Sequence, residues 1–326
     1  MNFVCSERNG KVTPFGKHGR LHVDGRHLVD ENGEVVALHG ISTHNLNYYP
    51  EYVNEEAFTQ FADEYGVDIM RLAMYTQTAD GVPGYADTDD EGRRKLEELM
   101  LTGVRICASL GIYCIVDWHI LFDYNPKMNE DMSAKFWNSM ALRLRDYDNV
   151  IFEICNEPNM NTETGDKATW DDIRDYAHHI IDVIRDIDET KVIIVGTPIW
   201  SQRVDDAADN PLEYDNIMYT LHFYADSHKD ELRGRMKYAI DKDLPIFVTE
   251  FGICDASGNG PVNDTETDIW LKELEANDIS YVIWNLSNKD ETSAILKPEC
   301  DKINNFTSDD LSPCGERMVR IMTKFK

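Results

Sequence analysis

Two glutamates lie far apart in the chain, and each ends an apolar run of residues. The segment IFEICNEPN (residues 151–159) turns from apolar to polar at Asn156 and Glu157, just before Pro158. The segment FVTEFG places Glu250 at the end of a second apolar run. A pair of carboxyl groups can hydrolyse a glycosidic bond, because one protonates the leaving oxygen while the other attacks the sugar or activates water. The two glutamates therefore predict glycoside hydrolysis if the fold brings them together.

Other polar and aromatic side chains fall at the same place in their own apolar runs. They are Arg71 and Tyr75, His119, His222 and Tyr224, and Trp284. An arginine beside one glutamate would lower the pKa of that carboxyl group and hold it ionised. Aromatic faces suit the apolar faces of pyranose rings, and amide or imidazole groups can bind sugar hydroxyls. Taken singly each residue is weak support, since a turn or a cap explains it equally well.

A regular alternation of strands and helices would position these residues. We expect eight short apolar strands, at residues 35–41, 68–75, 113–119, 150–157, 192–197, 216–224, 245–252 and 280–287. Amphipathic helical patterns separate them, for example at residues 55–66, 92–111, 134–147 and 170–188. Apolar strands that alternate with helices indicate a parallel sheet, and eight units close a (β/α)8 TIM barrel of the α/β class. A doubly wound sheet is the competitor, but no Gly-x-Gly-x-x-Gly follows the first strand.

The barrel places all eight carboxyl strand ends on one rim, where such enzymes carry their active sites. One difficulty is local: in a regular strand Asn156 and Glu157 point to opposite faces. Both can reach the site only if the strand ends or bends there. Pro158 favours an ending, because it has no N–H to donate to a neighbouring strand. We therefore predict a break in regular pairing before Glu157.

The ends of the chain and one long loop complete the expected organisation. The segment at residues 20–36 has the turn signals Asp24-Gly25 and Asn32-Gly33 and predicts a short N-terminal β-hairpin. We expect one glycoside hydrolase catalytic domain over residues 1–326, with an extension and hairpin at 1–34 and the barrel at 35–326. Residues 287–311 form a loop long enough to shape the cleft.

Composition limits the partners. The chain carries 32 basic and 60 acidic residues, a formal charge of −28, so nucleic acid and anionic membrane surfaces would repel it. No apolar run is long enough for a transmembrane helix, and the first residues have no apolar signal core. Seven cysteines leave at least one thiol unpaired, and the spacing of Cys300 and Cys314 leaves their pairing open. No His-x-His or His-Glu-x-x-His motif supports a metal site, so we expect no metal and no cofactor.

The motifs together resemble glycoside hydrolase family 5, and within it the bacterial endo-β-1,4-glucanases of subfamily 2. The resemblance runs from HGISTHNLNYY (39–49) to SNKDETSAILKP (287–298). Its most specific parts are MRLAMYT, IVDWHI, IFEICNEPN, LHFYA, FVTEFG and WNLSNKDETSA, in this order. The resemblance implies that Glu157 is the general acid/base and Glu250 the nucleophile of a retaining mechanism. It also implies that Arg71 and Tyr224 hydrogen-bond the nucleophile.

Further roles follow only from this resemblance. Asn156 would contact the 2-hydroxyl of the sugar at the cleavage point, His119 and His222 would orient substrate hydroxyls and the acid/base, and Trp284 would lie under a sugar. Residues expected along the neighbouring subsites are His44, Tyr48, Tyr75, Trp200, Ala256, Lys289 and Glu291. Tyr48 stands where many relatives carry a tryptophan platform, which puts the strength of a distal subsite in doubt. Phe251 also replaces a tryptophan, and we expect only a packing change there.

Two alternatives remain open from the residues. The same chemistry could act on mannan, xyloglucan or mixed-linkage glucan, because loops set specificity. A non-catalytic carbohydrate-binding barrel is the rival of another class, although such proteins usually lose a carboxylate. We expect a β-glucan polysaccharide or oligosaccharide as the substrate and a monomer as the working form. The polymer is too large to enter a cell, so we expect an extracellular location, with no membrane partner and as part of a larger secreted multidomain protein.

Overall fold

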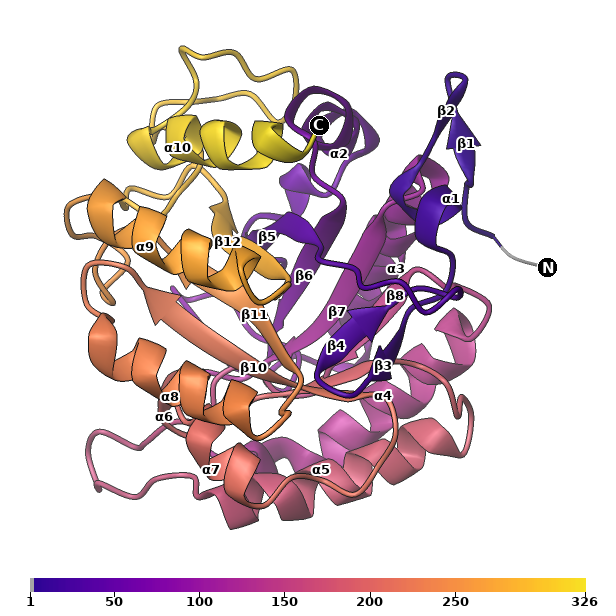
Figure 1. The fold of residues 1–326 in the computed structure, drawn as a ribbon, viewed down its shortest axis with the longest axis vertical. Helices are drawn as coiled ribbons and strands as arrows, with labels where there is room; N and C mark the ends of the chain where they lie inside the picture. The colour runs from indigo at the N-terminus through magenta and orange to yellow at the C-terminus, as the bar shows by residue number, and fades with distance from the viewer. Residues whose placement is uncertain (1–2) are drawn as a thin grey trace.

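Eight parallel strands close into a barrel in the computed structural model, which describes residues 3–326 (Figure 1). Around the barrel the strand order is β10-β11-β12-β5-β6-β7-β8-β9. The barrel strands are β5 (His39–Asn45), β6 (Ile69–Tyr75), β7 (Tyr113–His119), β8 (Val150–Glu153), β9 (Ile193–Val195), β10 (Ile217–Tyr224), β11 (Ile246–Gly252) and β12 (Tyr281–Leu286). The predicted (β/α)8 barrel is thus confirmed.

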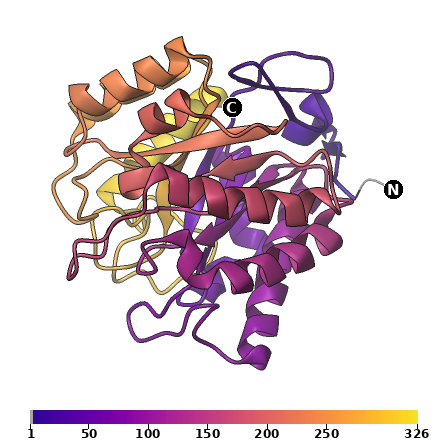
Figure 2. The same cartoon turned by 90° about the horizontal axis from the view of Figure 1, so that it is seen from below.

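Helices surround the barrel on the outside (Figures 1 and 2). They are α2 (Glu55–Gln60), α3 (Asp90–Leu110), α4 (Glu130–Leu144), α5 (Trp170–Arg185), α7 (Val204–Asp209), α8 (Asp230–Asp241), α9 (Asp264–Glu275) and α10 (Pro313–Met322). Helix α5 shows why they form: Ile173, Ile180 and Ile184 recur on one buried face. Thr169 and Asp172 close its first turn in a reciprocal capping box. Short helical turns flank these helices at η1 (Pro50–Tyr52), η2 (Phe61–Tyr65), η3 (Pro126–Asn129) and η4 (Thr323–Phe325).

The strands sort their side chains between two apolar layers with a period of two. In β7, Ile115 packs inside the barrel, whereas Cys114 and Val116 join the layer beneath the helices. In β6, Ile69 fills the lower interior, and Arg71 and the residues after it on the same face rise toward the carboxyl ends. An apolar plug therefore closes the lower barrel and leaves the upper layer for polar groups.

The N-terminal segment closes the opposite opening of the barrel. It contains β1 (Glu7–Arg8), β2 (Lys11–Val12), α1 (Pro14–His18), β3 (His22–Asp24) and β4 (His27–Val29). Phe15, Leu21 and Leu28 belong to the same apolar cluster as the barrel interior. The predicted hairpin is present as β3 and β4, but its two-residue turn is Gly25–Arg26. Gly25 has a φ of 56°, a conformation that suits glycine.

Three boundaries differ from those expected. The first barrel strand spans His39–Asn45 rather than 35–41, because Val35 pairs back on Val29 of the hairpin. Strand β8 ends at Glu153 rather than at residue 157, and β9 is likewise shorter than expected.

Cys300 and Cys314 are both buried free thiols, so they do not pair. Among the described residues, no helix has the length and apolarity needed to cross a membrane.

Candidate active site

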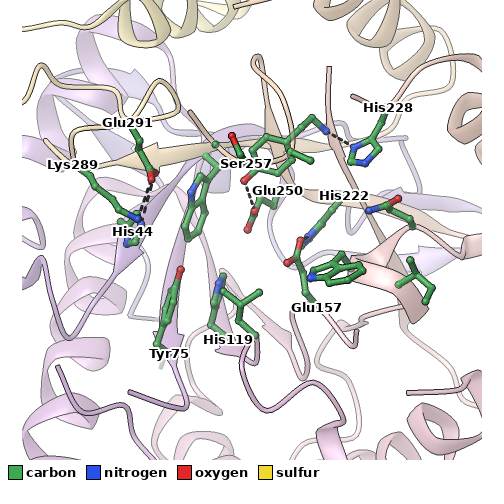
Figure 3. Close-up of a pocket in the computed structure, with 18 residues that line it drawn as sticks. His44, Tyr75, His119, Glu157, His222, His228, Glu250, Ser257, Lys289 and Glu291 are labelled. Carbon is green, nitrogen blue, oxygen red and sulfur yellow. Dashed lines mark hydrogen bonds and ion pairs between the residues drawn. The ribbon is translucent and has the colours of Figure 1, made fainter. Parts of the chain in front are cut away.

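A cavity of about 600 Å³ opens among residues at the carboxyl ends of the barrel strands, and Glu157 and Glu250 both line it (Figure 3). One carboxyl oxygen of Glu157 and one of Glu250 lie within 4.8 Å of each other. A ring nitrogen of His222 lies within the same distance of both oxygens. The barrel therefore brings the two glutamates to opposite sides of one small space.

Glu157 reaches the cavity because β8 ends early. Regular pairing stops at Glu153, and side-chain bonds together with single backbone bonds, such as that from Asn156 N to the carbonyl oxygen of Trp118 at 3.2 Å, hold the chain beyond it. Ser201 Oγ donates to the carbonyl oxygen of Asn156 at 2.6 Å, and Asn159 Nδ2 donates to that of Glu157 at 2.8 Å. The predicted break before Glu157 is confirmed. It allows Glu157 to line the cavity while the side chain of Asn156 contacts Arg71 and His119 beside it.

Arg71 lies fully buried beneath the cavity and holds together acidic groups from several strands. Its nitrogens donate to Glu153 at 2.8 and 3.2 Å, to Asn156 Oδ1 at 2.6 Å and to Glu250 Oε2 at 3.1 Å, and they lie 3.1 Å from Asp117 Oδ2. A planar guanidinium with five N–H groups suits such a site better than an ammonium does. The contact between Arg71 and Glu250 is the one the resemblance implied.

Both oxygens of Glu250 receive donors that favour its ionised form. Tyr224 Oη donates to Oε1 at 2.9 Å, and Arg71 donates to Oε2. Burial and the nearby Glu157 carboxyl nevertheless raise the pKa of Glu250 to about 7, against the opposing effects of His222, Arg71 and Tyr224. Near pH 7 the protonation of Glu250 therefore depends on two opposing effects. Burial and Glu157 favour its neutral form, whereas its hydrogen-bond donors favour its ionised form.

Glu157 has a different environment. Its Oε1 lies 2.9 Å from Nδ1 of His222. Burial raises the pKa of Glu157 to about 7, Arg71 opposes this, and the charge of Glu153 adds to it. Burial also lowers the pKa of His222 to about 4, so its imidazole is neutral near pH 7. A neutral imidazole gives Glu157 less support for a negative charge than Arg71 and Tyr224 give Glu250.

The balance of charge supports at least one proton on the acidic groups of this site. Four buried carboxyl groups, of Asp117, Glu153, Glu157 and Glu250, lie around the single guanidinium of Arg71. Like charges this close cannot all be ionised in a desolvated site. Two coupled carboxyl groups titrate as a pair rather than separately. Since Glu250 has the better donors, Glu157 is the group that retains the proton.

Asn156 and His119 form a second hydrogen-bonded unit beside the glutamates. Nδ1 of His119 lies 2.6 Å from Asp117 Oδ2, and its Nε2 lies 3.2 Å from Asn156 Nδ2. Since the amide oxygen of Asn156 accepts from Arg71, its Nδ2 side faces His119 and donates. Tyr75 stacks on His119 with ring centroids 4.3 Å apart. These contacts fix the orientation of both the amide and the imidazole.

One end of the cavity has aromatic and charged walls. Trp284 and His119 lie nearly parallel, with ring centroids 5.3 Å apart, and His44 packs against Trp284 at 5.0 Å. Beyond His44, Lys289 Nζ pairs with Glu291 at 2.9 Å (Figure 3). Lys289 and Glu291 belong to the segment after β12, which has no helix or strand before α10, so the predicted cleft-shaping loop does reach the cavity.

The chain segment after β9 forms the other end. Here Ile199, Trp200 and Ser201 have φ values of 58°, 54° and 54°, so the short element α6 (Pro198–Ser201) is a left-handed turn. Such backbone costs on the order of 1–3 kcal/mol per residue and persists only where other contacts hold it. Trp200 N donates to the carbonyl oxygen of Pro158 at 2.9 Å. The turn thereby places Trp200 in the cavity wall, beside the segment that carries Glu157.

Seven of the eight residues expected along the subsites line the cavity: His44, Tyr75, Trp200, Ala256, Trp284, Lys289 and Glu291. Tyr48 does not, since it lies 42% exposed with its ring edge-on against Tyr49. Lining residues that were not predicted are Leu121, Ile199, Gln202, His228, Ser257 and Gly258. They come from loops, where no period or motif distinguishes them.

The sequence analysis also missed the buried acids and hydroxyl beneath the cavity. Asp117, Glu153 and Thr249 are all fully buried. One signal existed: Glu153 is a charged residue inside the apolar run IFEIC. A charge in such a run must find a partner, since an unpaired buried charge is costly.

Glu157, Glu250 and His222 offer three donor atoms of a kind that can coordinate a divalent cation. The guanidinium of Arg71, which donates to Glu250, opposes a second positive charge there. The three donor atoms thus favour a cation in this site, whereas the guanidinium disfavours one. The expectation that the reaction needs no metal stays a prediction.

Comparison with known proteins places the chain among the cellulases. The family model described as "Cellulase (glycosyl hydrolase family 5)" matches residues 29–290. Endoglucanase A of Butyrivibrio fibrisolvens is 40% identical over 95% of this chain and 70% of its own length. An endoglucanase of Clostridium saccharobutylicum is 42% identical over 93% of this chain. The chain spans 64% of the length of that second relative.

Solved structures agree with these relatives. A structure described as cellulase Cel5C_n is 40% identical, with a TM-score of 0.87 over 95% of this chain and 94% of that one. The catalytic domain of the Thermobifida fusca endoglucanase Cel5A is 31% identical, with a TM-score of 0.86 over 95% of this chain and 99% of that one. A variant of that domain has been solved in complex with cellotetraose.

Proposed function

The chain belongs to glycosyl hydrolase family 5, and from this premise we propose that it is an endo-β-1,4-glucanase that cleaves cellulose or related β-glucans with retention of configuration. The observation that carries the proposal is the unequal pair of glutamates. Glu250 accepts hydrogen bonds from Arg71 and Tyr224, whereas Glu157 faces the neutral imidazole of His222. One carboxylate and one carboxylic acid across a cleft are what a retaining glycosidase requires.

In the first step, the ionised Glu250 attacks the anomeric carbon and forms a covalent glycosyl ester. The protonated Glu157 donates its proton to the departing glycosidic oxygen, which leaves as a hydroxyl. As the negative charge of Glu250 is used in bond formation, Arg71 and Tyr224 keep the carboxyl group aimed at the sugar. Because the carboxyl group is already in position, less entropy is lost when the reacting atoms come together.

In the second step, Glu157, now a carboxylate, takes a proton from water as the water attacks the anomeric carbon. The ester bond to Glu250 breaks, and the enzyme returns to its initial protonation state. Retaining enzymes hold their carboxyl groups about 5–5.5 Å apart, whereas inverting enzymes need roughly 6.5–9.5 Å to admit water. An oxygen–oxygen separation within 4.8 Å supports the covalent route.

The walls of the cavity supply substrate recognition in this proposal. Trp284 would support a glucose ring on its face, and Asn156 would contact the 2-hydroxyl at the cleavage point. Lys289, Glu291 and His44 would bind hydroxyl groups at one end. A second set at the other end, with Trp200 and Ala256, would hold the departing part of the chain. Residues with one face apolar and one edge polar suit sugars, which have the same character.

We propose further that residues 1–326 act as one catalytic unit, which works as a monomer outside the cell. Its partner is a β-glucan polymer or oligosaccharide, with no nucleic acid and no membrane. Support for an extracellular location is the size of the polymer. The net charge of −28 supports the exclusion of polyanionic partners.

One assay tests the enzyme, the residue pair and the substrate class together. Wild type, Glu157→Gln and Glu250→Gln are compared on carboxymethylcellulose, lichenan, mannan, xyloglucan and xylan. We expect hydrolysis of the first two substrates by wild type only, and no effect of a chelator. Faster hydrolysis of mannan or xyloglucan would change the proposed substrate but not the proposed mechanism. Oligosaccharide binding without turnover by wild type would favour the non-catalytic alternative.

A further inference from the structure

Glu153 is a buried acid for which the mechanism above has no use. Both of its carboxyl oxygens accept hydrogen bonds from Arg71, and Oε1 also accepts from Thr249 Oγ1 at 2.7 Å. Burial raises the pKa of Glu153, and the charge of Arg71 opposes this. Because a guanidinium that cannot lose its proton donates to both oxygens, the geometry favours the carboxylate form of Glu153. A carboxylate can only accept, so Thr249 is the donor of its bond to Glu153.

Thr249 connects this carboxylate to His222. The hydroxyl of Thr249 has one proton, and that proton lies on the short contact to Glu153. Nε2 of His222 lies 2.9 Å from the same hydroxyl oxygen. Because Thr249 has no second proton to give, Nε2 must carry the hydrogen of this bond. Thr220 Oγ1 lies 2.5 Å from Thr249 Oγ1, and by the same proton count it is the donor of that bond.

The tautomer of His222 then determines what faces Glu157. With its proton on Nε2, a neutral imidazole presents a lone pair at Nδ1. Nδ1 lies 2.9 Å from Glu157 Oε1, so the proton of that bond belongs to Glu157. Burial, which lowers the pKa of His222, supports the neutral ring over the imidazolium.

We propose that Glu153 is a positioning residue that, through Thr249, holds His222 in its Nε2–H tautomer and thereby keeps Glu157 protonated. The catalytic meaning of this arrangement rests on the proposed function, because only a glycosidase needs Glu157 as an acid. Glu153 never touches the substrate. Arg71, which holds Glu153 ionised, also holds Glu250, so one guanidinium prepares the acid and the nucleophile from opposite sides.

The arrangement serves both steps. In the first, the proton on Glu157 moves to the glycosidic oxygen. The hydrogen bonds that link Glu153 through Thr249 to His222 stay unchanged. Glu157 is then a carboxylate facing a lone pair, which makes it a stronger base toward water. Other titratable or charged groups around Glu157 are Arg71, Tyr75, Asp117, His119, Glu153, Tyr224 and Glu250. Within residues 3–326, His222 is the one titratable group that forms a hydrogen bond with a carboxyl oxygen of Glu157.

Thr249→Val tests the connection, because it removes the hydroxyl and keeps the shape. His222 is then free to turn its proton to Nδ1 and stabilise an ionised Glu157. We expect the alkaline limb of the kcat/KM profile to fall by about one pH unit, the size of one hydrogen bond to a charged group. Thr249→Ser, which restores a hydroxyl, should restore the limb. Thr267→Val is the matched control: Thr267 is equally buried, but its hydroxyl donates to the backbone carbonyl of Asn263, just before α9.

Two NMR measurements keep this inference separate from the proposed function. The ring nitrogens of His222 in wild type should show a protonated Nε2 and a bare Nδ1. The carboxyl carbon of Glu157 should titrate at a lower pH in Thr249→Val than in wild type and Thr267→Val. Both readouts need no turnover, so they hold even if no β-glucan is a substrate. A proton on Nδ1 in wild type overturns the proposal, as does a folded Thr249→Val with an unchanged Glu157 titration. If Thr249→Val does not fold, the nitrogen measurement on wild type decides alone.

Discussion

Arg71 Nη1 donates to Oε2 of Glu250 at 3.1 Å from a position with no exposed surface. The same side chain also contacts Glu153, Asp117 and Asn156, so the nucleophile is aligned by a group that four strands or strand ends hold in place. Such a site cannot be tuned at one residue without affecting the others.

Arg71→Lys should therefore reduce activity strongly although the charge is kept. An ammonium cannot reach several separate acceptors, so Glu250 loses its alignment. We expect kcat to fall by roughly 10²–10³, the range seen when a preorganised donor is removed. Stability should fall as well, by about 3–5 kcal/mol, since buried carboxylates lose their partner. Steady-state kinetics measures kcat, and thermal unfolding measures stability. A variant as active and as stable as wild type would contradict the role of Arg71 in aligning Glu250 and pairing the buried carboxylates.

Most of the barrel could be predicted from the sequence, because strand and helix periods are local. Glu157 and Glu250 were found for a related reason: each interrupts an apolar run at its end, where the barrel gathers side chains. The network below them could not be predicted in the same way. Glu153 and Thr249 meet from strands that are distant in the sequence, and a threonine in a strand is ordinary. Tyr48 shows a limit of motifs. A motif indicates which residue occupies a position, but not which way a loop side chain points, and Tyr48 lies exposed outside the cavity wall.

Azide should distinguish the roles of the two glutamates. In Glu157→Ala with an aryl cellobioside that has a good leaving group, Glu250 still forms the covalent ester, and azide then replaces water. The expected product is the β-glycosyl azide. In Glu250→Ala, azide occupies the place of the nucleophile and should give the α-glycosyl azide. NMR of the products identifies the anomers, and the reverse pairing would exchange the two assignments.

The pH dependence of activity should be a narrow bell with its maximum near pH 7. Activity requires Glu250 ionised and Glu157 protonated, and the pKa of each is raised to about 7. Below the maximum the pair gains a second proton and the nucleophile is lost. Above it, the pair loses its last proton and the acid is lost. The two apparent pKa values belong to the pair. A broad plateau over several pH units in kcat/KM would contradict the prediction, because it would require the two groups to titrate several pH units apart rather than both near 7.

Glu157→Gln should stabilise the fold at alkaline pH while it abolishes acid catalysis. A carboxyl group with a raised folded-state pKa contributes most below its unfolded pKa, and that contribution is lost as pH rises through about 7. The amide of glutamine mimics the protonated acid and has no charge to desolvate. We expect a gain in the free energy of unfolding on the order of 2 kcal/mol at pH 8 and little gain at pH 4. Urea unfolding at both pH values measures it. Asp310, whose pKa is lowered to about 2 beside Lys302, gives a control with the opposite sign, since Asp310→Asn should destabilise at pH 8.

Tyr48→Trp should strengthen binding of longer oligosaccharides. Tyr48 stands outside the cavity wall, 42% exposed and edge-on to Tyr49, so its ring offers little face to a sugar. A larger indole has more surface with which to cover a distal glucose unit. We expect KM to fall about two- to fivefold for cellopentaose, a gain of under about 1 kcal/mol, and kcat to stay unchanged. Cellotriose, which is too short to reach that position and the cleavage point together, is the matched substrate control. An equal change in KM for both oligosaccharides would show that residue 48 acts on the cleavage site rather than on a separate subsite.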